Sequence, residues 1–225
     1  MICKKFLIVL VLIFSFGLSH AQIIEKIYFF DEINVSKIDD YDLIKFNNTV
    51  LKGKIGEPSL PYYPVSLLLP PGHIAESIEI ILEGKIDLPD NYNIYPKQSS
   101  KLSTEDVADN LVINNDIYKS NYVYPKNSTD KISTEFINGY SIATSAFTPV
   151  KYYPASGKLS YFKKIIIRIK TKETSTAVCA LQNLDSSVNI IYKIKNISQN
   201  PEILPQYHDL KYDKDAYQML INNHD

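Results

Sequence analysis

The chain of 225 residues is poor in glycine and contains no tryptophan, with 7 Gly and 0 Trp. The shortage of glycine argues against glycine-rich loops that cradle phosphate groups, and the lack of tryptophan argues against tryptophan-lined sugar sites. An excess of basic residues is also missing, because 24 Lys and Arg stand against 25 Asp and Glu and leave a net charge of −1. Proteins that bind nucleic acid carry a basic footprint that neutralises phosphates. The composition therefore predicts that nucleic acid is not a partner.

Cysteine and histidine are scarce as well. The histidines beyond residue 21, His73, His208 and His224, stand far apart, and no HExxH or CxxC spacing offers a zinc site. There is no G-x-S-x-G elbow, and Cys179 has no neighbouring histidine to activate its sulfur. We expect Cys179 to be a small buried residue and His73 to face solvent in a turn. The sequence thus predicts no metal, no cofactor and no catalytic residue.

A leader is predicted at the N-terminus, where Lys4 and Lys5 precede an apolar run from Phe6 to Leu18. A charged start, a short apolar run and small residues before a cleavage site are the parts of a secretory signal. A membrane-spanning helix needs about 20 apolar residues, which this run does not reach. We therefore expect a signal peptide over residues 1–21, cleaved after Ala21, and a product secreted to the periplasm or the cell exterior. No membrane span is expected after signal cleavage.

Short runs rich in Ile, Val, Tyr and Phe, bounded by Pro, Gly, Asn or Asp, dominate the chain after residue 21. Such runs are typical of strands joined by turns. In the clearest run, Ile165, Ile167 and Ile169 alternate with residues that end in Arg168 and Lys170, so one face is expected to be buried. The pattern predicts an all-β fold, an antiparallel β-sandwich of jelly-roll type with at most one or two short helices. The predicted strands are Ile23 to Phe30, Tyr41 to Phe46, Tyr62 to Leu69, Ser77 to Leu82, Ser141 to Thr148, Leu159 to Lys172 and Ser187 to Ile197.

Other segments lack a clear strand pattern. A short helix is expected from Ser103 to about Leu111, and residues 213–221 are ambiguous between helix and strand. Residues 114–134 are predicted to form a long loop or a loosely paired excursion, and loops of this length are usually functional or mobile. Residues 198–215, with two prolines and a charged run, are expected to be a linker that leaves the domain. From the residues alone, an adhesion module, an inhibitor and a pro-region all remain open.

Two stretches of the chain contain motifs of prolines and glycines. The first reads Gly-Glu-Pro-Ser-Leu-Pro from residue 56 and continues through a strand into a Pro-Pro-Gly turn at residue 72. The second runs from residue 138 to residue 159 and contains a proline- and glycine-shaped hairpin before a long strand. The two stretches resemble the pro-domains of gingipain-type secreted cysteine peptidases of the C25 family. The positions that match are Gly56, Pro58, Leu60 and Pro61 in the first stretch and Pro149, Pro154 and Gly157 in the second.

A third stretch, from Tyr217 to Ile221, resembles the first strand of the peptidase domain in that family. The resemblance implies three parts: a signal peptide at 1–21, a gingipain-like pro-domain at 22–205, and a linker with a truncated start of a catalytic domain at 206–225. Neither Gly72-His73 nor Cys179 matches the catalytic motifs of the family. We therefore expect that this chain alone does not cleave peptides.

The resemblance implies a pro-domain that assists folding of the catalytic domain and covers its active-site cleft, in cis or in trans, until it is cleaved. In basic-specific members of the family a Lys or Arg of the pro-domain is expected to enter the specificity pocket. The candidates here are the loop lysines Lys119, Lys126 and Lys131, and the candidate processing points besides Ala21 are Lys211 and Lys214. The alternative is a free-standing secreted β-sandwich that serves in binding or adhesion.

Overall fold

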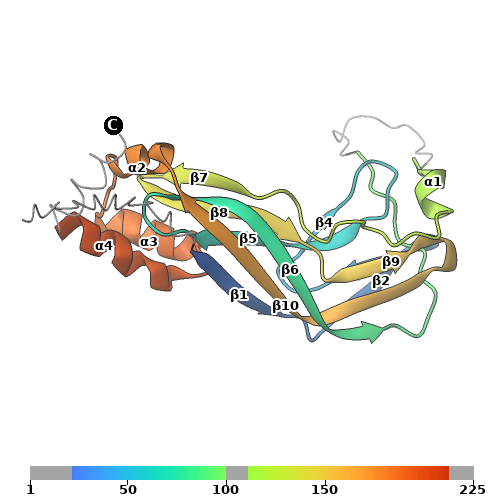
Figure 1. The fold of residues 1–225 in the computed structure, drawn as a ribbon. Coiled ribbons are helices and arrows are strands. Elements are labelled where there is room, and N and C mark those ends of the chain that lie inside the picture. Colours follow the sequence, from blue (N-terminus) through green and yellow to red (C-terminus); the bar gives the residue numbers. More distant parts are fainter. Residues whose placement is uncertain (1–21, 100–110, 213–225) are drawn as a thin grey trace, which may run out of the picture.

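The computed structural model describes residues 22–99 and 111–212, in which the strands form antiparallel sheets (Figure 1). One sheet has the order β1-β10-β6 and consists of β1 (Ile23–Phe29), β10 (Lys158–Glu173) and β6 (His73–Asp87), with β9 (Val150–Tyr153) paired to β10. A second sheet has the order β4-β5-β8-β7 and consists of β4 (Val50–Lys52), β5 (Leu60–Leu68), β8 (Tyr140–Phe147) and β7 (Ser133–Ile137). A separate hairpin joins β2 (Asn34–Ile38) to β3 (Tyr41–Lys45). The predicted all-β class with antiparallel sheets is confirmed.

The main core lies between the two larger sheets. On β10 the isoleucines at odd positions, Ile165, Ile167 and Ile169, are fully buried, as their alternation predicted. Across the core, the rings of Tyr28 on β1 and Phe147 on β8 lie 5.1 Å apart in a tilted arrangement. Aromatic pairs in this geometry stabilise a core beyond the area they bury. The aliphatic face of one sheet and the aromatic residues between the sheets thus hold the sandwich together.

The outer face of the first sheet carries rows of ion pairs. The guanidinium Nε of Arg168 donates to Glu25 Oε2 at 2.6 Å, and Lys164 Nζ lies 2.9 Å from Glu83 Oε2. These side chains are between about a third and half exposed, so solvent screens each pair and each contributes little to stability. The rows keep this face of the sheet hydrated, as the alternation along β10 predicted.

One of these pairs gives a pH-dependent prediction. Glu76 lies 2.7 Å from Lys170 and 3.7 Å from Lys172, and the hydrogen bond and charge of Lys170 hold the pKa of Glu76 below its ordinary value of 4.5. A carboxyl group with a depressed pKa in the folded state stabilises the fold above its ordinary pKa, and this stabilisation disappears as the pH falls through the folded pKa. We expect Glu76→Gln to lower the urea midpoint at pH 7, and we expect this effect to disappear as the pH falls through the depressed pKa of Glu76 in the folded state.

The same difference should shrink in about 1 M salt, because exposed ion pairs are screened. Urea unfolding followed by circular dichroism, repeated across pH and salt, checks both points. A difference between the two proteins that stays constant across pH would show that Glu76 acts through packing rather than charge.

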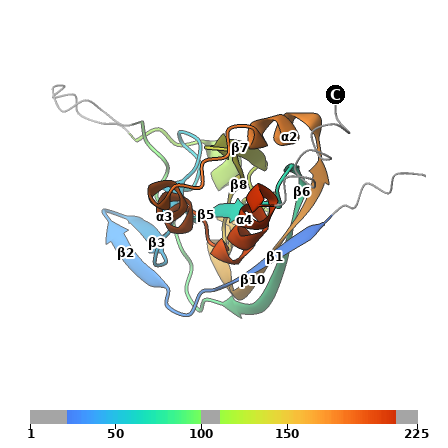
Figure 2. The ribbon, with the colours of Figure 1, turned by 90° about the vertical axis from the view of Figure 1, so that its left-hand side faces the viewer.

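Short helices gather mainly at one end of the sandwich, and this end faces the viewer in Figure 2. These are α2 (Ser175–Leu181), α3 (Val188–Ile197) and α4 (Leu204–Tyr212), with the 3₁₀ turn η2 (Pro201–Ile203) before α4. At the opposite end lie α1 (Asn115–Tyr118) and the 3₁₀ turn η1 (Pro154–Ser156) (Figure 1). The described residues therefore contain more helix than the one or two short helices that we expected.

The strand predicted from Ser187 to Ile197 is wrong, because α3 occupies this segment. Its isoleucine content suggested a strand, but Ile190, Ile191 and Ile194 follow the spacing of one helical face. Ile194 is fully buried, and it belongs to a second core between the helices and the end of the second sheet. Packing of this apolar face against the second core stabilises a helix, and this effect outweighs the β-propensity of isoleucine.

The linker expected over residues 198–215 is also wrong as far as Tyr212, since this segment contains η2 and α4. Tyr207 on α4 is fully buried, and its hydroxyl donates to the carbonyl of Leu69 at 2.9 Å and accepts from the amide of Ser141 at 3.0 Å. Burial raises the pKa of Tyr207 to about 12, so the phenol stays protonated and available for this pairing at neutral pH. The boundary that we placed after residue 205 falls inside α4.

Two further expectations on single residues are corrected. Cys179 is exposed rather than buried, because α2 turns its neighbours Val178 and Leu181 into the protein and Cys179 outward. His73 begins β6 and is 8% exposed, with its Nδ1 donating to the carbonyl of Pro71 at 2.8 Å. We expected His73 to face solvent because it follows a Pro-Pro-Gly turn. It is buried instead, because it is the first residue of β6.

Some expectations concern residues outside the described ranges. They are the signal peptide with its cleavage after Ala21, most of the helix expected from Ser103 onward, the ambiguous residues 213–221, and Lys214. Across residues 22–99 and 111–212, no helix is both long enough and apolar enough to cross a bilayer.

Candidate functional site

The end of the sandwich that carries α1 brings together loops from distant parts of the sequence. Gly56 joins two of them, because its amide donates to the carbonyl of Lys97 at 2.7 Å and its carbonyl accepts from the amide of Asn114 at 2.9 Å. Its φ of 81° lies in the left-handed region, and an added Cβ would lie 3.0 Å from the Asn114 nitrogen. Glycine meets both conditions at low cost. Gly56 thus holds residues 97 and 114 on its two sides.

Gln98 adds a second link between the same two loops. Its side-chain amide donates to the carbonyl of Val112 at 2.9 Å and accepts from the amide of Val112 at 3.0 Å. The amide group therefore pairs with the backbone of residue 112 as a neighbouring strand would. No local pattern in the sequence indicates this pairing, since the two residues become neighbours only in the fold.

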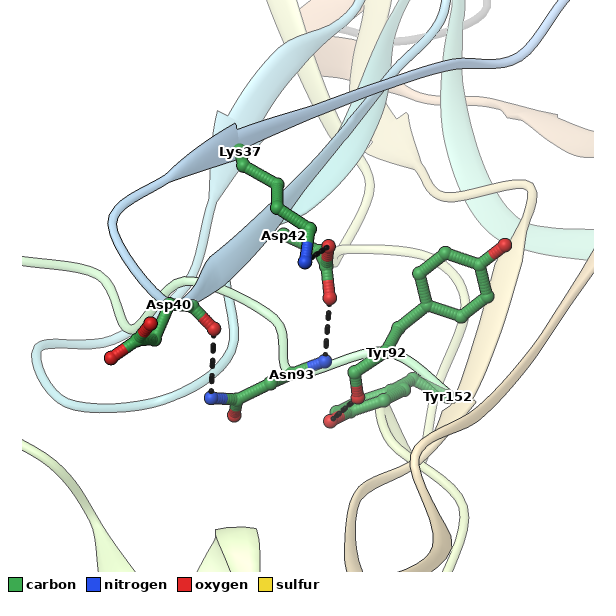
Figure 3. Close-up of polar contacts among 6 residues, drawn as sticks. All are labelled: Lys37, Asp40, Asp42, Tyr92, Asn93 and Tyr152. Carbon is green, nitrogen blue, oxygen red and sulfur yellow. Dashed lines mark hydrogen bonds and ion pairs between the residues drawn. The ribbon is translucent and has the colours of Figure 1, made fainter. Parts of the chain in front are cut away.

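Residues 92 and 93 precede the loops at this end, and they are attached to β3 through Asp42, as Figure 3 shows. The carboxylate of Asp42 accepts from the amide of Asn93 at 2.8 Å, and the amide of Asp42 donates to the carbonyl of Asn93 at 2.7 Å. Tyr152 on β9 donates from its hydroxyl to the carbonyl of Tyr92 at 2.8 Å (Figure 3). Lys37 lies 4.0 Å from the same carboxylate. Residues 92 and 93 are therefore tied to two strands at once.

The helix α1 is fixed to the same segment. Its N-cap, Asn114, accepts from the backbone amides of Asp116 and Ile117 through its side chain. Tyr118 donates its hydroxyl to the carbonyl of Ile94 at 2.5 Å. Burial raises the pKa of Tyr118, so its hydroxyl keeps the proton that this bond requires. A helix of four residues is thus anchored at its beginning and its end.

A groove of about 590 Å³ lies beside α1. Tyr124 lines this groove and donates to Glu57 Oε2 at 3.1 Å, and burial together with the charge of Glu57 raises the pKa of Tyr124. Tyr122 is 86% exposed, which is unusual for an aromatic side chain. The lining is formed by Glu57, Ile117, Ser120, Tyr122, Val123, Tyr124, Lys126 and Pro154. An exposed aromatic residue beside an apolar groove is typical of a surface that binds another molecule.

An ionic cluster lies at the same end. Lys52 on β4 pairs with Asp130, and its ammonium also lies 5.2 Å from the centre of the Tyr62 ring. The pKa of Tyr62 is raised to about 12. Burial is the largest cause, and the charges of Asp130 and Glu57 add to it. Lys52 therefore makes its ionic and aromatic contacts inside the domain, with Asp130 and Tyr62.

The three candidate lysines are all exposed but have different surroundings. Lys126 lines the groove and directly follows the cis peptide bond between Tyr124 and Pro125. Lys119 is the C-cap of α1, and its backbone amide bonds to the last turn of that helix. Lys131 lies two residues before β7. The structure therefore brings only Lys126 of the three into the groove lining.

The positions that carry the sequence resemblance lie mostly around this end. Pro58 forms an isolated bridge with Pro96, and Leu60 and Pro61 pair with β4. Pro149 accepts from the amide of Phe162 at 3.0 Å. Pro154 opens η1, and Gly157, with φ of 67°, ends it in the left-handed region before β10. Of the candidate processing points, Lys211 lies in the last turn of α4.

Within residues 22–99 and 111–212, no group of three or more His, Cys, Asp or Glu side chains is placed to hold a metal ion. The described groove also lacks a His or Cys among its lining residues. What this arrangement offers is a hydrogen-bonded, partly apolar surface with one lysine in its lining. Such a surface supports binding of another protein.

Comparisons with known proteins place this fold. The family model Propeptide_C25 matches residues 22–197. Two solved structures from Porphyromonas gingivalis are similar in fold. A complex of the RgpB pro- and mature domains is 18% identical, with a TM-score of 0.61 over 82% of this chain and 96% of that one. A structure described as giving insight into zymogenic latency of gingipain K is 15% identical, with a TM-score of 0.54 over 71% of this chain and 96% of that one.

No curated protein matches the sequence. The family match covers most of the residues that the structure describes, and it concerns a propeptide and not a catalytic domain. The sandwich, the groove end and the motif positions from Gly56 to Gly157 all lie inside the matched range. The chain therefore belongs to the C25 propeptide family.

Proposed function

We propose that this chain is the pro-domain of a secreted C25-family cysteine peptidase, and that it assists folding of the catalytic domain and keeps it latent by covering the active-site cleft. The single observation that carries the proposal is the family match over residues 22–197. The solved relatives of the same fold are described as a pro-domain complexed with its mature domain and as a case of zymogenic latency. The partner of this chain would accordingly be a C25-type catalytic domain, in cis or in trans.

The groove end is the surface that we assign to this contact. An inhibitor of a peptidase has to present a chain that binds the cleft but is held out of the geometry for attack. Segments that are fixed before binding lose little conformational entropy when they bind. The links through Gly56, Gln98 and Asp42 provide such fixation, and Tyr122 and Lys126 provide an exposed aromatic side chain and a charge.

The route to this state includes export and processing. The proposed leader at residues 1–21 would direct secretion to the periplasm or the exterior, with cleavage after Ala21. Release of the pro-domain would follow cleavage after Lys211 or Lys214. Peptidases bind substrates as extended chains, so cleavage after Lys211 requires the last turn of α4 to unwind. The nucleotide sequence downstream of codon 225 tests the link to a peptidase, since it should encode a histidine-glycine motif and then a catalytic cysteine.

Inhibition in trans is the direct test. We expect the chain from residue 22 onward to inhibit the C25 peptidase of the same organism with an inhibition constant below about 1 μM. Residual activity on a peptide substrate, measured over a range of chain concentrations, gives this constant. An absence of inhibition at a large molar excess would refute the latency role. It would favour the alternative of a free-standing binding or adhesion sandwich.

We infer an order among the three lysines from their surroundings. Only Lys126 lines the groove, so we expect Lys126→Ala to weaken inhibition by a factor of roughly 30, which corresponds to about 2 kcal/mol for a central contact residue. Lys119→Ala and Lys131→Ala are the matched controls and should change the constant less than about threefold. Lys126→Arg should recover inhibition if the peptidase pocket accepts either basic residue. If all three alanine variants inhibit like the parent chain, the pocket residue lies elsewhere.

A further inference from the structure

The strand β1 leaves one edge of the first sheet open. It pairs with β10 on one side and with no other strand of the described residues (Figure 1). Three of the four side chains on its outer face are apolar and exposed, with 68% exposure at Ile23, 41% at Ile27 and 68% at Phe29. In register with Ile27 on the same face lie Ile166 of β10 and Ile81 of β6, so the apolar row continues across the sheet.

The same four residues turn their backbone groups toward the open side. The amide of Phe30 donates to the carbonyl of Lys163 at 2.9 Å, and the carbonyl of Gln22 accepts from the amide of Thr171 at 2.8 Å. Even-numbered residues of β1 therefore bond to β10, and in an antiparallel pair the odd-numbered ones face away. No described residue pairs with these backbone groups of Ile23, Glu25, Ile27 or Phe29.

We propose that β1 is an interface at which a second copy of this chain adds its own β1 in antiparallel orientation, centred on Ile27. The two-fold axis would pass through the pair of Ile27 residues. The two sheets would join into one continuous sheet, with the three exposed apolar residues of each strand on a common face. An exposed edge strand of this length, without proline or a bulge, is a template for strand pairing.

The charges of β1 disfavour two registers close to this one. Pairing centred on Lys26 would place Lys26 opposite its own copy, and pairing centred on Glu25 would do the same with Glu25. Like charges directly opposite each other destabilise a sheet. Pairing centred on Ile27 instead places Glu25 opposite Phe29 and Lys26 opposite Tyr28. Of the registers centred on Glu25, Lys26 and Ile27, only the one centred on Ile27 places no two like charges opposite each other.

This interface is separate from the groove end, because β1 lies along the free edge of the first sheet and α1 lies at the far end of the sandwich (Figure 1). Self-association and inhibition of a peptidase thus depend on different residues. A variant that abolishes one should retain the other.

Analytical ultracentrifugation of the chain from residue 22 onward tests the association. This chain contains every residue of the described fold. We expect a monomer–dimer equilibrium in the micromolar range, and we expect Ile27→Lys to weaken it at least about tenfold by placing two lysines at the axis. The matched control is Val188→Lys on α3, which changes a side chain that is 82% exposed and lies outside β1, and it should leave the dimer intact. Circular dichroism verifies that both variants fold.

A cross-linking experiment tests the register. Residues opposite each other in a hydrogen-bonded antiparallel pair have Cα atoms about 5.5 Å apart, a distance that a disulfide spans. With Cys179→Ala as background, Ile27→Cys should form a covalent dimer on mild oxidation, whereas Glu25→Cys should not. A monomer at the highest concentration, equal cross-linking of the two variants, or Ile27→Lys that dimerises like the parent chain would each overturn the proposal. So would a chain that is monomeric alone but loses peptidase binding through Ile27→Lys, since the edge would then receive a strand of the peptidase.

Discussion

Replacing Gly139 by alanine is expected to destabilise the fold by roughly 4 kcal/mol, a large part of the 5–15 kcal/mol that is typical of a domain. Asn138 and Gly139 form the turn between β7 and β8, and their φ angles of 51° and 85° are both positive. An alanine Cβ at residue 139 would lie 2.5 Å from the Cα and 2.7 Å from the nitrogen of Leu184. Because these are backbone atoms, no side-chain rotation relieves the clash.

Urea unfolding monitored by circular dichroism measures this loss, and Gly84→Ala provides the matched control. Gly84 also has a positive φ, of 67°, but its added Cβ would first meet the Cβ of Lys163 at 3.3 Å. Gly84→Ala should therefore cost only the strain of the left-handed conformation, about 1–2 kcal/mol. Equal losses for the two variants would contradict the close approach of residue 139 to the loop between α2 and α3.

Replacing Asn200 by alanine should cost about 3 kcal/mol, because it leaves two buried backbone groups without partners. The side-chain oxygen of Asn200 accepts from the amide of Leu68 at 2.6 Å, and its nitrogen donates to the carbonyl of Leu68 at 2.9 Å. Asn200 is 2% exposed, and Leu68 is fully buried. Water cannot replace the lost bonds without opening this region.

The control for Asn200 is Asn189→Ala, which removes the same amide group from an exposed position on α3 and should change stability by less than about 0.5 kcal/mol. Hydrogen exchange gives an independent readout, since the amide of Leu68 should lose protection in the Asn200 variant. A stability within about 0.5 kcal/mol of the parent chain would mean that the pairing with Leu68 contributes nothing net.

Both changes concern the attachment of the helical end to the sandwich. Gly139 lies against the loop after α2. Gln199 and Asn200 accept from the amides of Ser66 and Leu68, which lie on β5 beyond the residues 60–62 that pair with β4. The family match ends at residue 197, but these bonds and the burial of Tyr207 continue the fold to α4. For the proposed processing at Lys211, the helix α4 would have to open before a peptidase could act.

The sequence predicted the sandwich correctly where the local pattern and the tertiary environment agree. The alternating isoleucines of β10 identified both the strand and its buried face. Successive side chains of a strand point to opposite faces, so an alternating apolar set can be buried only on one of them. The strands from Tyr62 and Ser141 were predicted from runs rich in Ile, Val, Tyr and Phe between turn residues, and they correspond to β5 and β8. The prediction failed from residue 187, where isoleucine content suggested a strand and the apolar face of α3 decided for a helix.

For the candidate site, local sequence indicated the glycine and proline positions, because turns depend on residues close together in the chain. The loop predicted over residues 114–134 is only partly correct, since this segment contains α1 and the first two residues of β7. It could not indicate that Gln98 pairs with Val112 or Asp42 with Asn93, since these pairs are far apart in sequence and meet only in the fold. By itself the sequence determined the fold class, the positions of most strands and the family resemblance. Only the tertiary structure decided that Lys126 alone of the three lysines lines the groove and that β1 is an open edge, because both depend on which distant segments lie side by side.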